Sequence, residues 1–430
     1  MRILWIVNLV LPQLSEELKI RNSASGTWLF EWSKKLSESN NTFAVACVYG
    51  DEFRTIETKG IKFYLLPGTG KNMLFYTKKY EKYWKQIVDE FKPDIINIHG
   101  TEYSHGLSCM RANPQEHYLV SMQGILTKIK DVDFGGLTKR DILFNRTFKE
   151  NIKFNGLIEN HIIHVKNHKY ELEMIKRADA IAYVNDFDYG FTKSVNAKAE
   201  FFNVDYDMQA IFKESNKWNV DTCKRHIIFT NPGGTPLKGL HQLLKAIAII
   251  KEEYPDLLVV VPGMGCDGKL VVKNGYSKYI SKLINKLDIS SNVSFLSYQT
   301  PSEMCSNMLN ANVVVIPSAI EGTSLILREA MYLGCPCVVS LRGGMANYIS
   351  NGVNAFGYEY NDYQKLADII KNVFSMGCSE LTNLSKRAIE RTKYYDTSKS
   401  FDSLIFAYQS MINKNMNEDH IDNCEQAISE

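Results

Sequence analysis

The sequence has no long apolar run, no paired cysteine motif and almost no net charge. No window of about 18 apolar residues occurs in it, so we expect no segment to span a membrane. Fifty basic and 48 acidic side chains leave a formal net charge of +2, which excludes the strong positive field of a typical nucleic-acid-binding protein. The sequence also shows no internal repeat and no low-complexity segment, so repeat and disordered classes are excluded.

The nine cysteines are scattered, and only Cys335 and Cys337 lie close together. Without a second pair they do not supply the ligands of a structural zinc site. The opening MRILWIVNLVLP carries one arginine, a short apolar run that ends at Pro12, and no small-residue cleavage site. It is therefore interpreted as a buried first strand rather than a secretory signal. Scattered cysteines and no signal peptide together favour a reducing cytoplasm.

The chain is long enough for two domains of roughly 200 residues each. Short apolar runs alternate with longer amphipathic stretches, which indicates strands buried on both faces and separated by helices. The pattern restarts after Asp221, so the sequence predicts two doubly wound parallel sheets of the α/β class. The expected strands are 2–8, 43–49, 62–67, 94–99, 117–122, 180–184, 200–204, 226–230, 257–262, 293–297, 312–317 and 336–340. The expected helices include 74–91, 240–254, 276–288, 302–311, 324–334 and 363–376.

The polar stretch 206–221 marks the boundary between the two series. We expect an N-terminal domain over 1–205 and a C-terminal domain over 215–397. A helix at about 398–414 is long enough to cross back onto the first domain. The acidic and polar residues 415–430 are expected to form a disordered tail.

The strongest chemical signal follows the apolar run that ends at Pro317, where the sequence continues as EGTSLILRE. Thr323 or Ser324 is a good N-cap, so a helix is expected to begin at Leu325. The N-terminus of a helix presents free N–H groups and a positive dipole end, which suit a diphosphate. Gly322 would let the backbone come close to such a ligand.

Glu329 lies too deep in the expected helix for a capping box, which needs an acid three residues after the cap. Its neighbours are apolar on almost every side, so a carboxylate there needs partners. The vicinal hydroxyls of a ribose would satisfy both oxygens. The alternative is a surface glutamate paired with Arg328 or with a neighbouring helix.

This region resembles a known family. The Glu-x7-Glu run from Glu321 to Glu329, the preceding VVVIPS and the following EAMYLGCPCVVSLRGGMANYISNGVNAFGY are similar to retaining glycosyltransferases of family 4, also called group 1. The resemblance is dense from about Asn231 to Asp362. It implies the GT-B fold, in which two Rossmann-like domains face each other across a cleft.

The resemblance also implies roles for single residues. Glu321 would contact the transferred sugar near the reaction centre, and Glu329 would hold the nucleotide ribose. The backbone of Gly322, Thr323, Ser324 and Leu325 would meet the diphosphate. The family needs neither a metal nor another cofactor beyond the nucleotide sugar.

A second signal is NPGGTPLKG, a glycine-rich turn that ends in Lys238 at the start of an expected helix. Such a turn can hold phosphate through N–H groups and a point charge, although alone it also fits a plain turn with a solvated lysine. The family has an arginine about five residues before this lysine. Here Gly233 takes that place, so another cation must act, with Arg328 and Arg342 as candidates, or diphosphate binding is weaker.

The run Gly263-Met-Gly265-Cys-Asp-Gly268 matches the GxGxxG pattern of dinucleotide-binding proteins. That motif must open directly into a helix, whereas here a helix is expected only near Tyr276. We therefore interpret Gly263 as part of a loop that lines the nucleotide pocket, and NAD binding is not expected.

In the N-terminal domain, Gly26 is a candidate for donor binding, and His99 and Gln123 are candidate catalytic residues. Gly26 belongs to a long loop, 9–26, which in the resembling family approaches the donor phosphates. His99 ends an apolar run, where a histidine is either functional or hydrogen-bonded for structure. Gln123 stands where many family members have a histidine near the sugar. Glutamine cannot act as a base but can bind a hydroxyl, which suits a mechanism in which the leaving phosphate takes the acceptor's proton.

The segment 127–169 mixes lysines and arginines with phenylalanines. It could meet a lipid diphosphate acceptor or an anionic membrane surface at the inner face of the membrane, or it could be a solvated helical face. His161, His164 and His168 share one helix face, but no carboxylate or cysteine completes a metal site in sequence.

The function predicted from these observations is transfer of a sugar, with retention, to a hydroxyl of a glycan or lipid-linked glycan, as in bacterial surface polysaccharide synthesis. The alternatives are a GT-B relative that modifies the nucleotide sugar, such as a UDP-sugar 2-epimerase, and a non-catalytic sugar-binding protein. No recognisable acid–base constellation for epimerisation is present, and a plain sugar binder has no use for a diphosphate site.

Overall fold

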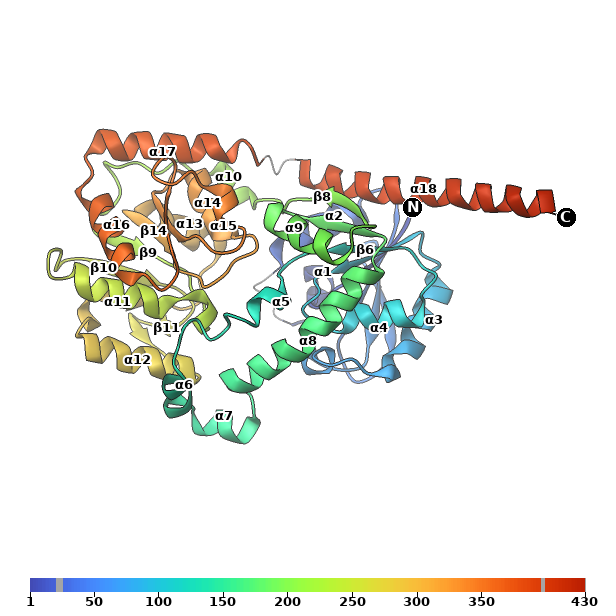
Figure 1. Ribbon diagram of the computed structural model, residues 1–430, viewed down its shortest axis with the longest axis horizontal. Coiled ribbons are helices and arrows are strands. Elements are labelled where there is room, and N and C mark those ends of the chain that lie inside the picture. The colour runs from blue at the N-terminus through green and yellow to red at the C-terminus, as the bar shows by residue number, and fades with distance from the viewer. Residues whose placement is uncertain (21–25, 396–398, 430) are drawn as a thin grey trace. The chain divides into compact units, whose positions relative to one another are not determined.

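The computed structural model describes residues 1–20, 26–395 and 399–429, and the chain divides into two compact units (Figure 1). The first unit comprises Met1–Thr127, Val165–Asp207 and Thr397–Glu430. The second unit comprises Lys128–His164 and Met208–Asp396. Each unit is built on its own parallel sheet, so the predicted α/β class with two doubly wound sheets is confirmed.

The sheet of the first unit has the strand order β3-β4-β2-β1-β5-β6-β7-β8. All neighbouring strands are parallel except β3 and β4. The order reverses between β1 and β5, and ligands of doubly wound sheets bind at the carboxyl ends of strands at such a switch point. The strands are β1 (Arg2–Ile6), β2 (Thr42–Val48), β3 (Arg54–Thr58), β4 (Ile61–Leu66), β5 (Ile95–His99), β6 (Tyr118–Ser121), β7 (Ala180–Tyr183) and β8 (Glu200–Asn203).

Helices of the first unit follow most of these strands. Helix α3, for example, packs into the core through its side chains Trp84, Ile87 and Phe91. The helices are α1 (Pro12–Glu17), α2 (Thr27–Ser37), α3 (Glu81–Phe91), α4 (His105–Ala112), α5 (Leu126–Ile129), α9 (Asp186–Val195) and α18 (Ser400–Ser429), with α8 (Leu157–Arg177) passing from the second unit into the first.

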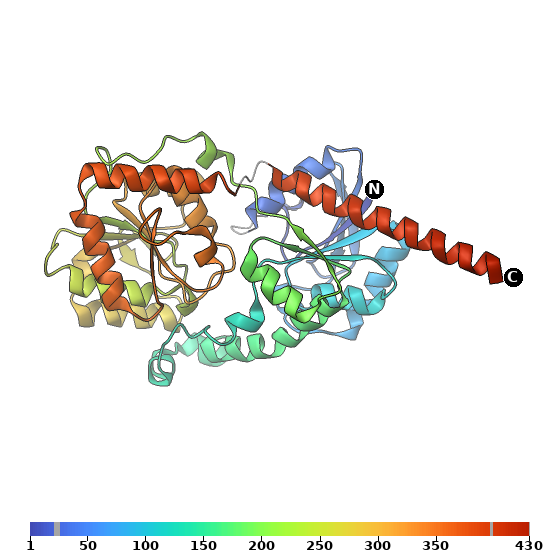
Figure 2. The same ribbon diagram turned by 45° about the horizontal axis from the view of Figure 1, so that its top comes forward.

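The sheet of the second unit is parallel throughout, with the order β13-β10-β9-β14-β15-β16. Its order reverses between β9 and β14, and helices lie on both of its sides (Figure 2). All four residues of β14 are buried, as expected for a central strand with helices on both faces. The strands are β9 (Ile227–Phe229), β10 (Leu258–Val261), β13 (Val293–Phe295), β14 (Val313–Ile316), β15 (Cys337–Ser340) and β16 (Phe356–Tyr358), with a separate hairpin of β11 (Gly265–Cys266) and β12 (Lys269–Leu270).

The helices of the second unit begin with two short ones that precede the main series. They are α6 (Lys139–Asn145), α7 (Phe148–Lys153), α10 (Ala210–Glu214), α11 (Leu240–Ile250), α12 (Gly275–Leu287), α13 (Pro301–Asn310), α14 (Leu325–Leu333), α15 (Met345–Tyr348), α16 (Tyr363–Ser375) and α17 (Cys378–Thr392).

The segment 128–164 belongs to the second unit, whereas the sequence analysis placed it in the domain 1–205. Hydrogen bonds hold this segment on the second unit. The Gly135 carbonyl accepts them from His241 Nε2 and Tyr360 Oη, both at 2.7 Å. A Cβ on Gly135 would lie 2.2 Å from the Pro236 carbonyl oxygen, so only glycine permits this close approach. An amphipathic pattern shows that a segment packs, but not on which unit.

Helix α18 belongs to the first unit although it follows the second unit in sequence. Its Tyr408 hydroxyl is fully buried and accepts hydrogen bonds from Trp5 Nε1 (2.8 Å) and Asn97 Nδ2 (2.7 Å). The helix continues to Ser429, through most of the range 415–430 that was expected to be a disordered tail. That range contains neither proline nor glycine, the residues that end helices most strongly. Among the described residues, no helix is long and apolar enough to cross a membrane.

Candidate functional site

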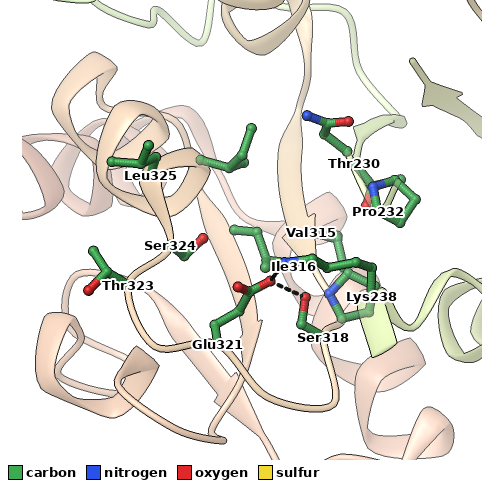
Figure 3. Close-up of a pocket in the computed structure, with 13 residues that line it drawn as sticks. Thr230, Pro232, Lys238, Val315, Ile316, Ser318, Glu321, Thr323, Ser324 and Leu325 are labelled. Carbon is green, nitrogen blue, oxygen red and sulfur yellow. Dashed lines mark hydrogen bonds and ion pairs between the residues drawn. The ribbon is translucent and has the colours of Figure 1, made fainter. Parts of the chain in front are cut away.

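A cavity of about 180 Å³ lies at the switch point of the second sheet (Figure 3). The residues that follow β9 form one wall, and the residues that follow β14 form another. This is the position where doubly wound sheets bind ligands. The lining residues are Thr230, Asn231, Pro232, Lys238, Val315, Ile316, Pro317, Ser318, Glu321, Thr323, Ser324, Leu325 and Ile326.

The loop after β9 is fixed against the loop after β14 by a very close backbone approach. Gly239 has a φ of +71°, and a Cβ on it would lie 1.7 Å from the Pro317 carbonyl oxygen. The Ala319 N–H also donates a hydrogen bond of 2.7 Å to the Leu237 carbonyl. These contacts set the position of Lys238, which stands between Leu237 and Gly239.

Lys238 and Glu321 meet in this cavity. Lys238 Nζ lies 2.6 Å from Glu321 Oε1, and Ser318 Oγ donates a hydrogen bond of 2.7 Å to the same oxygen (Figure 3). The Glu321 side chain is only 14% exposed. Its carboxylate is therefore held in one orientation by a cation and a hydroxyl.

The backbone around Glu321 is fixed as well. The Glu321 carbonyl accepts a 2.8 Å hydrogen bond from the Gly344 N–H. A Cβ on Gly343, whose φ is +76°, would lie 2.1 Å from that carbonyl oxygen. The loop after β15 therefore packs tightly against Glu321 and leaves no room for a side chain at Gly343.

Helix α14 begins at the cavity. Ser324 is its N-cap, and the Leu327 N–H donates to Ser324 Oγ at 3.3 Å, as the sequence predicts. Because Thr323, Ser324 and Leu325 line the cavity, the positive end of the helix dipole lies there. Gly322 links Glu321 to this cap and is not itself a lining residue. Lys238 and the helix end together make the cavity suited to an anion.

Glu329 lies deeper, within α14, and does not line the cavity. Its side chain is buried, and burial raises its pKa to about 8, against a smaller opposing effect of Arg328. Among the residues that the structure describes, the Glu329 carboxyl makes no hydrogen bond. It is therefore a buried carboxyl that has capacity for a ligand's hydroxyl groups.

Gly233, which stands where the resembling family has an arginine, lies in a turn with a left-handed backbone conformation. Gly233 is exposed, with a φ of +58° and no heavy atom within 4 Å of a built Cβ. Any other residue there would be strained by its backbone conformation. Neither proposed substitute lines the cavity: Arg328 is buried, 5.8 Å from the centre of the Tyr348 ring, and Arg342 is exposed. Lys238 is thus the one cationic side chain among the lining residues.

The GxGxxG run, Gly263 to Gly268, does not open directly into a helix. After Gly263, residues Gly265–Cys266 and Lys269–Leu270 pair as an antiparallel hairpin, and α12 starts only at Gly275. Gly263 has a φ of +79° and is not a lining residue of the cavity. The expected start of the helix near Tyr276 is confirmed, and the run lacks the geometry of a dinucleotide motif.

The first unit has a smaller cavity, of about 10 Å³, near the end of β5. His99 is buried there, 4.4 Å from Trp5 between ring centres, and burial lowers its pKa to about 3. Both His99 ring nitrogens and Gln123 Nε2 are buried without a hydrogen-bond partner. His99 is therefore neutral near pH 7. The cavity is lined by Trp28, Trp32, His99, Ser121, Met122, Gln123, Ala182, Val204 and Tyr206.

Three buried titratable residues near this cavity were not predicted. Glu102 has a pKa raised to about 7 by burial, and burial also lowers the pKa of His105 to about 4. Glu171, on α8, accepts hydrogen bonds from the N–H groups of Leu126 (2.8 Å) and Thr127 (2.7 Å). Glu171 is far from its partners in sequence, so no local pattern could have identified it.

The remaining candidates from the sequence, Gly26 and the histidines of α8, cap a helix or make hydrogen bonds within their own unit. Gly26 is the N-cap of α2, with a φ of +79° and Leu9 where a Cβ would be. The preceding Ser23–Ser25 of the predicted loop lie outside the described residues. His161 and His164 each hydrogen-bond to Asp133 through Nδ1, at 3.1 and 2.8 Å. In the described part of the chain, no group of three or more His, Cys, Asp or Glu residues could hold a metal.

Comparison with known families gives a match for the second unit. Residues 212–393 match the model of the family described as "Glycosyl transferases group 1". This range contains Lys238, Glu321 and Glu329.

Among curated proteins, the chain is 30% identical to a D-inositol 3-phosphate glycosyltransferase of Corynebacterium urealyticum over 175 residues, which cover 41% of each chain. It is 27% identical over 197 residues to YqgM of Bacillus subtilis, an uncharacterized glycosyltransferase, covering 46% of this chain and 52% of that one. The chain thus spans about half or less of the length of these relatives.

Solved structures match over nearly the whole chain. A sucrose-phosphate synthase from Thermosynechococcus elongatus has a TM-score of 0.72 at 13% identity, covering 96% of this chain and 99% of that one. Anabaena Alr3699/HepE, solved in complex with UDP and glucose, has a TM-score of 0.65 at 13% identity, covering 95% and 100%. At this identity the likeness shows the fold alone, which is the GT-B fold of glycosyltransferases.

Proposed function

We propose, from the group 1 glycosyl transferase domain formed by residues 212–393, that the protein is a retaining, metal-independent glycosyltransferase. It moves a sugar from a nucleotide-diphosphate sugar to a hydroxyl of a glycan or lipid-linked glycan, as in bacterial surface polysaccharide synthesis. The observation that carries the proposal is the cavity at the switch point of β9 and β14, where Lys238, Glu321 and the N-terminus of α14 converge.

The donor diphosphate binds at the start of α14 and beside Lys238. Negative charge builds up on the diphosphate as the sugar leaves, and pre-oriented N–H groups and a cation stabilise such charge. Lys238 is paired with Glu321 in the structure. Binding of the diphosphate gives the lysine a second anionic partner, and Glu321 then contacts the transferred sugar.

Glu329 holds the ribose of the nucleotide. A buried carboxyl with no hydrogen bond among the described residues gains two partners when vicinal hydroxyls donate to it. Hydrogen bonds donated to the charged form favour ionisation, so the raised pKa of Glu329 should fall when the nucleotide binds.

His99 and Gln123 of the first unit bind sugar hydroxyls rather than take a proton. The pKa of His99 is about 3, so it is a very weak base at neutral pH, and an amide cannot act as a base. The leaving phosphate itself therefore takes the proton of the acceptor hydroxyl. The proposed location is the cytoplasm, at the inner face of the membrane, where lipid-linked acceptors are found.

The test is thermal stabilisation of the purified protein by UDP, GDP and several UDP- and GDP-sugars. A ligand at 100 times its Kd should add about 2.7 kcal/mol of apparent stability. We expect stabilisation by one nucleotide series and its loss in Glu329→Ala. Glu390→Ala, at an exposed position of α17, is the matched control and should keep it.

If Glu329→Ala does not fold, Glu329→Gln replaces it, since this variant keeps the side chain's shape. Absence of stabilisation by every nucleotide and nucleotide sugar would contradict the proposal. It would favour a non-catalytic sugar-binding protein instead.

A further inference from the structure

Two short helices of the second unit, α6 and α7 (Figure 1), and the residue after α7 carry large apolar side chains that are exposed. They fall within residues 143–154 and are between 56% and 80% exposed. We call them the apolar patch: Leu143, Phe144, Phe148, Ile152 and Phe154. Aromatic side chains are rarely left in water in such a group unless the surface binds something.

The charged side chains around the apolar patch are basic. Between residues 138 and 155, every exposed charged residue is a lysine or an arginine: Lys139, Arg140, Lys149 and Lys153. The Arg140 guanidinium lies 5.6 Å from the centre of the Phe144 ring, so basic and aromatic groups adjoin each other.

The two acidic residues of the same segment, Asp141 and Glu150, both act as helix caps. Asp141 caps α6 by accepting hydrogen bonds from Thr138. Glu150 is buried, caps α7 and accepts a 2.9 Å hydrogen bond from the Gly275 N–H. Glu150 is thus removed from the exposed surface, whereas Asp141 is partly exposed in the first turn of α6.

The spacing of these residues is helical. Phe148 and Ile152 are four residues apart on α7, and Lys149 and Lys153 form the adjacent row. The same spacing joins Arg140 to Phe144 on α6. Helix α7 thus presents an apolar row beside a basic row, whereas α6 carries Arg140 one turn before Phe144. Adjacent basic and apolar residues of this kind are the pattern of elements that lie in a membrane interface.

The base of the two helices is firmly attached to the second unit. Ile142 and Asn145 are buried, and Asn145 and Glu150 both contact the Gly275 turn at the start of α12. The apolar patch is therefore presented on a fixed support.

We propose that the apolar patch and its four flanking basic residues form a docking surface for an anionic phospholipid membrane. Exposed phenylalanines suit the acyl boundary, and the four flanking basic residues suit lipid phosphates. This inference deepens the membrane contact named in the proposed function and rests on it only for the location of the acceptor. It assigns the contact to α6 and α7 of the second unit, whereas the sequence analysis assigned it to the N-terminal domain.

The test is co-sedimentation of the full chain with vesicles of phosphatidylcholine alone and with added phosphatidylglycerol. We expect binding to the anionic vesicles that weakens as salt is raised. Phe148→Ser with Phe154→Ser, and separately Lys149→Glu with Lys153→Glu, should each weaken binding about tenfold or more. The matched controls are Phe406→Ser and Lys386→Glu with Lys393→Glu, which change exposed residues outside the patch.

Equal vesicle binding by patch variants and wild type would overturn the proposal, as would no binding of the wild type to anionic vesicles. Light scattering on the same proteins would show whether the patch instead joins two copies of the chain, which would also overturn it. Nucleotide stabilisation, measured in parallel, separates the two proposals. If the protein binds anionic vesicles through the apolar patch but is not stabilised by any nucleotide, only the proposed enzymatic function is contradicted.

Discussion

At the scale of single residues, Glu329 is a strongly perturbed acid of the candidate site. Burial raises its pKa from 4.5 to about 8, so the carboxyl is mostly protonated at pH 7. In the unfolded chain it would be ionised above about pH 4.5. The native state therefore holds a proton that the unfolded state has released, and stability falls as the pH rises through this window.

We predict that replacing Glu329 with glutamine flattens the pH dependence of stability. Raising the pH from 5 to 9 should destabilise the ligand-free wild type, with a contribution from Glu329 on the order of a few kcal/mol. Glu102 and Asp188, whose pKa values burial raises to about 7, act in the same direction in both proteins. The difference between wild type and Glu329→Gln in denaturant unfolding at each pH isolates Glu329. Parallel curves for the two proteins would refute this account.

The role of a single residue could be predicted where it follows from the residues next to it in sequence. Ser324 and the cavity residue Glu321 follow from a strand that leads into a capped helix. The ion pair of Lys238 with Glu321 could not be predicted, because the two residues are 83 positions apart and meet only through the packing of Gly239 on Pro317. The partners of Glu171 are also distant in sequence, since Thr127 and Leu126 lie 44 and 45 positions away.

At the scale of elements, the cavity depends on one close contact between two loops. Gly239→Ala would place a Cβ 1.7 Å from the Pro317 carbonyl oxygen, so the turn that carries Lys238 must move. We predict that this variant loses nucleotide stabilisation. Gly352→Ala is the matched control, since Gly352 has a similar φ of +76° but no heavy atom within 4 Å of the added Cβ. It should cost about 1 kcal/mol and keep nucleotide stabilisation in the same thermal assay. Retained stabilisation in Gly239→Ala would contradict the prediction.

The central strands of both sheets were predictable, and so were the edge strands β8 and β13, whereas the edge strands β3 and β16 were not. Buried β14 reads as an unbroken apolar run. In contrast, β3 is mostly exposed and pairs only with β4, and β16 has three residues at the edge of its sheet. Short strands with polar neighbours lack the pattern that identifies a buried strand. The hairpin β11–β12 has two residues in each strand and leaves no periodic signal.

At the scale of the whole chain, the first unit is completed by a helix that comes after the second unit in sequence. Tyr408 of α18 joins Trp5 of β1 to Asn97 of β5 in the core. We predict that Tyr408→Phe destabilises the first unit by about 1–3 kcal/mol, because both side-chain N–H groups lose their buried acceptor. Calorimetry should show a lower transition temperature for that unit. Tyr394→Phe, at a residue 76% exposed, is the control and should leave the transition unchanged. No shift in Tyr408→Phe would mean that water replaces the hydroxyl.

The chain passes between the units four times, at 127/128, 164/165, 207/208 and 396/397. During synthesis on the ribosome, every segment of the second unit is therefore made before the last segment of the first. The second unit can fold as soon as residue 396 has emerged, whereas the buried acceptors that α18 supplies are still missing from the first. The domain whose strands are translated first is thus the domain that is finished last.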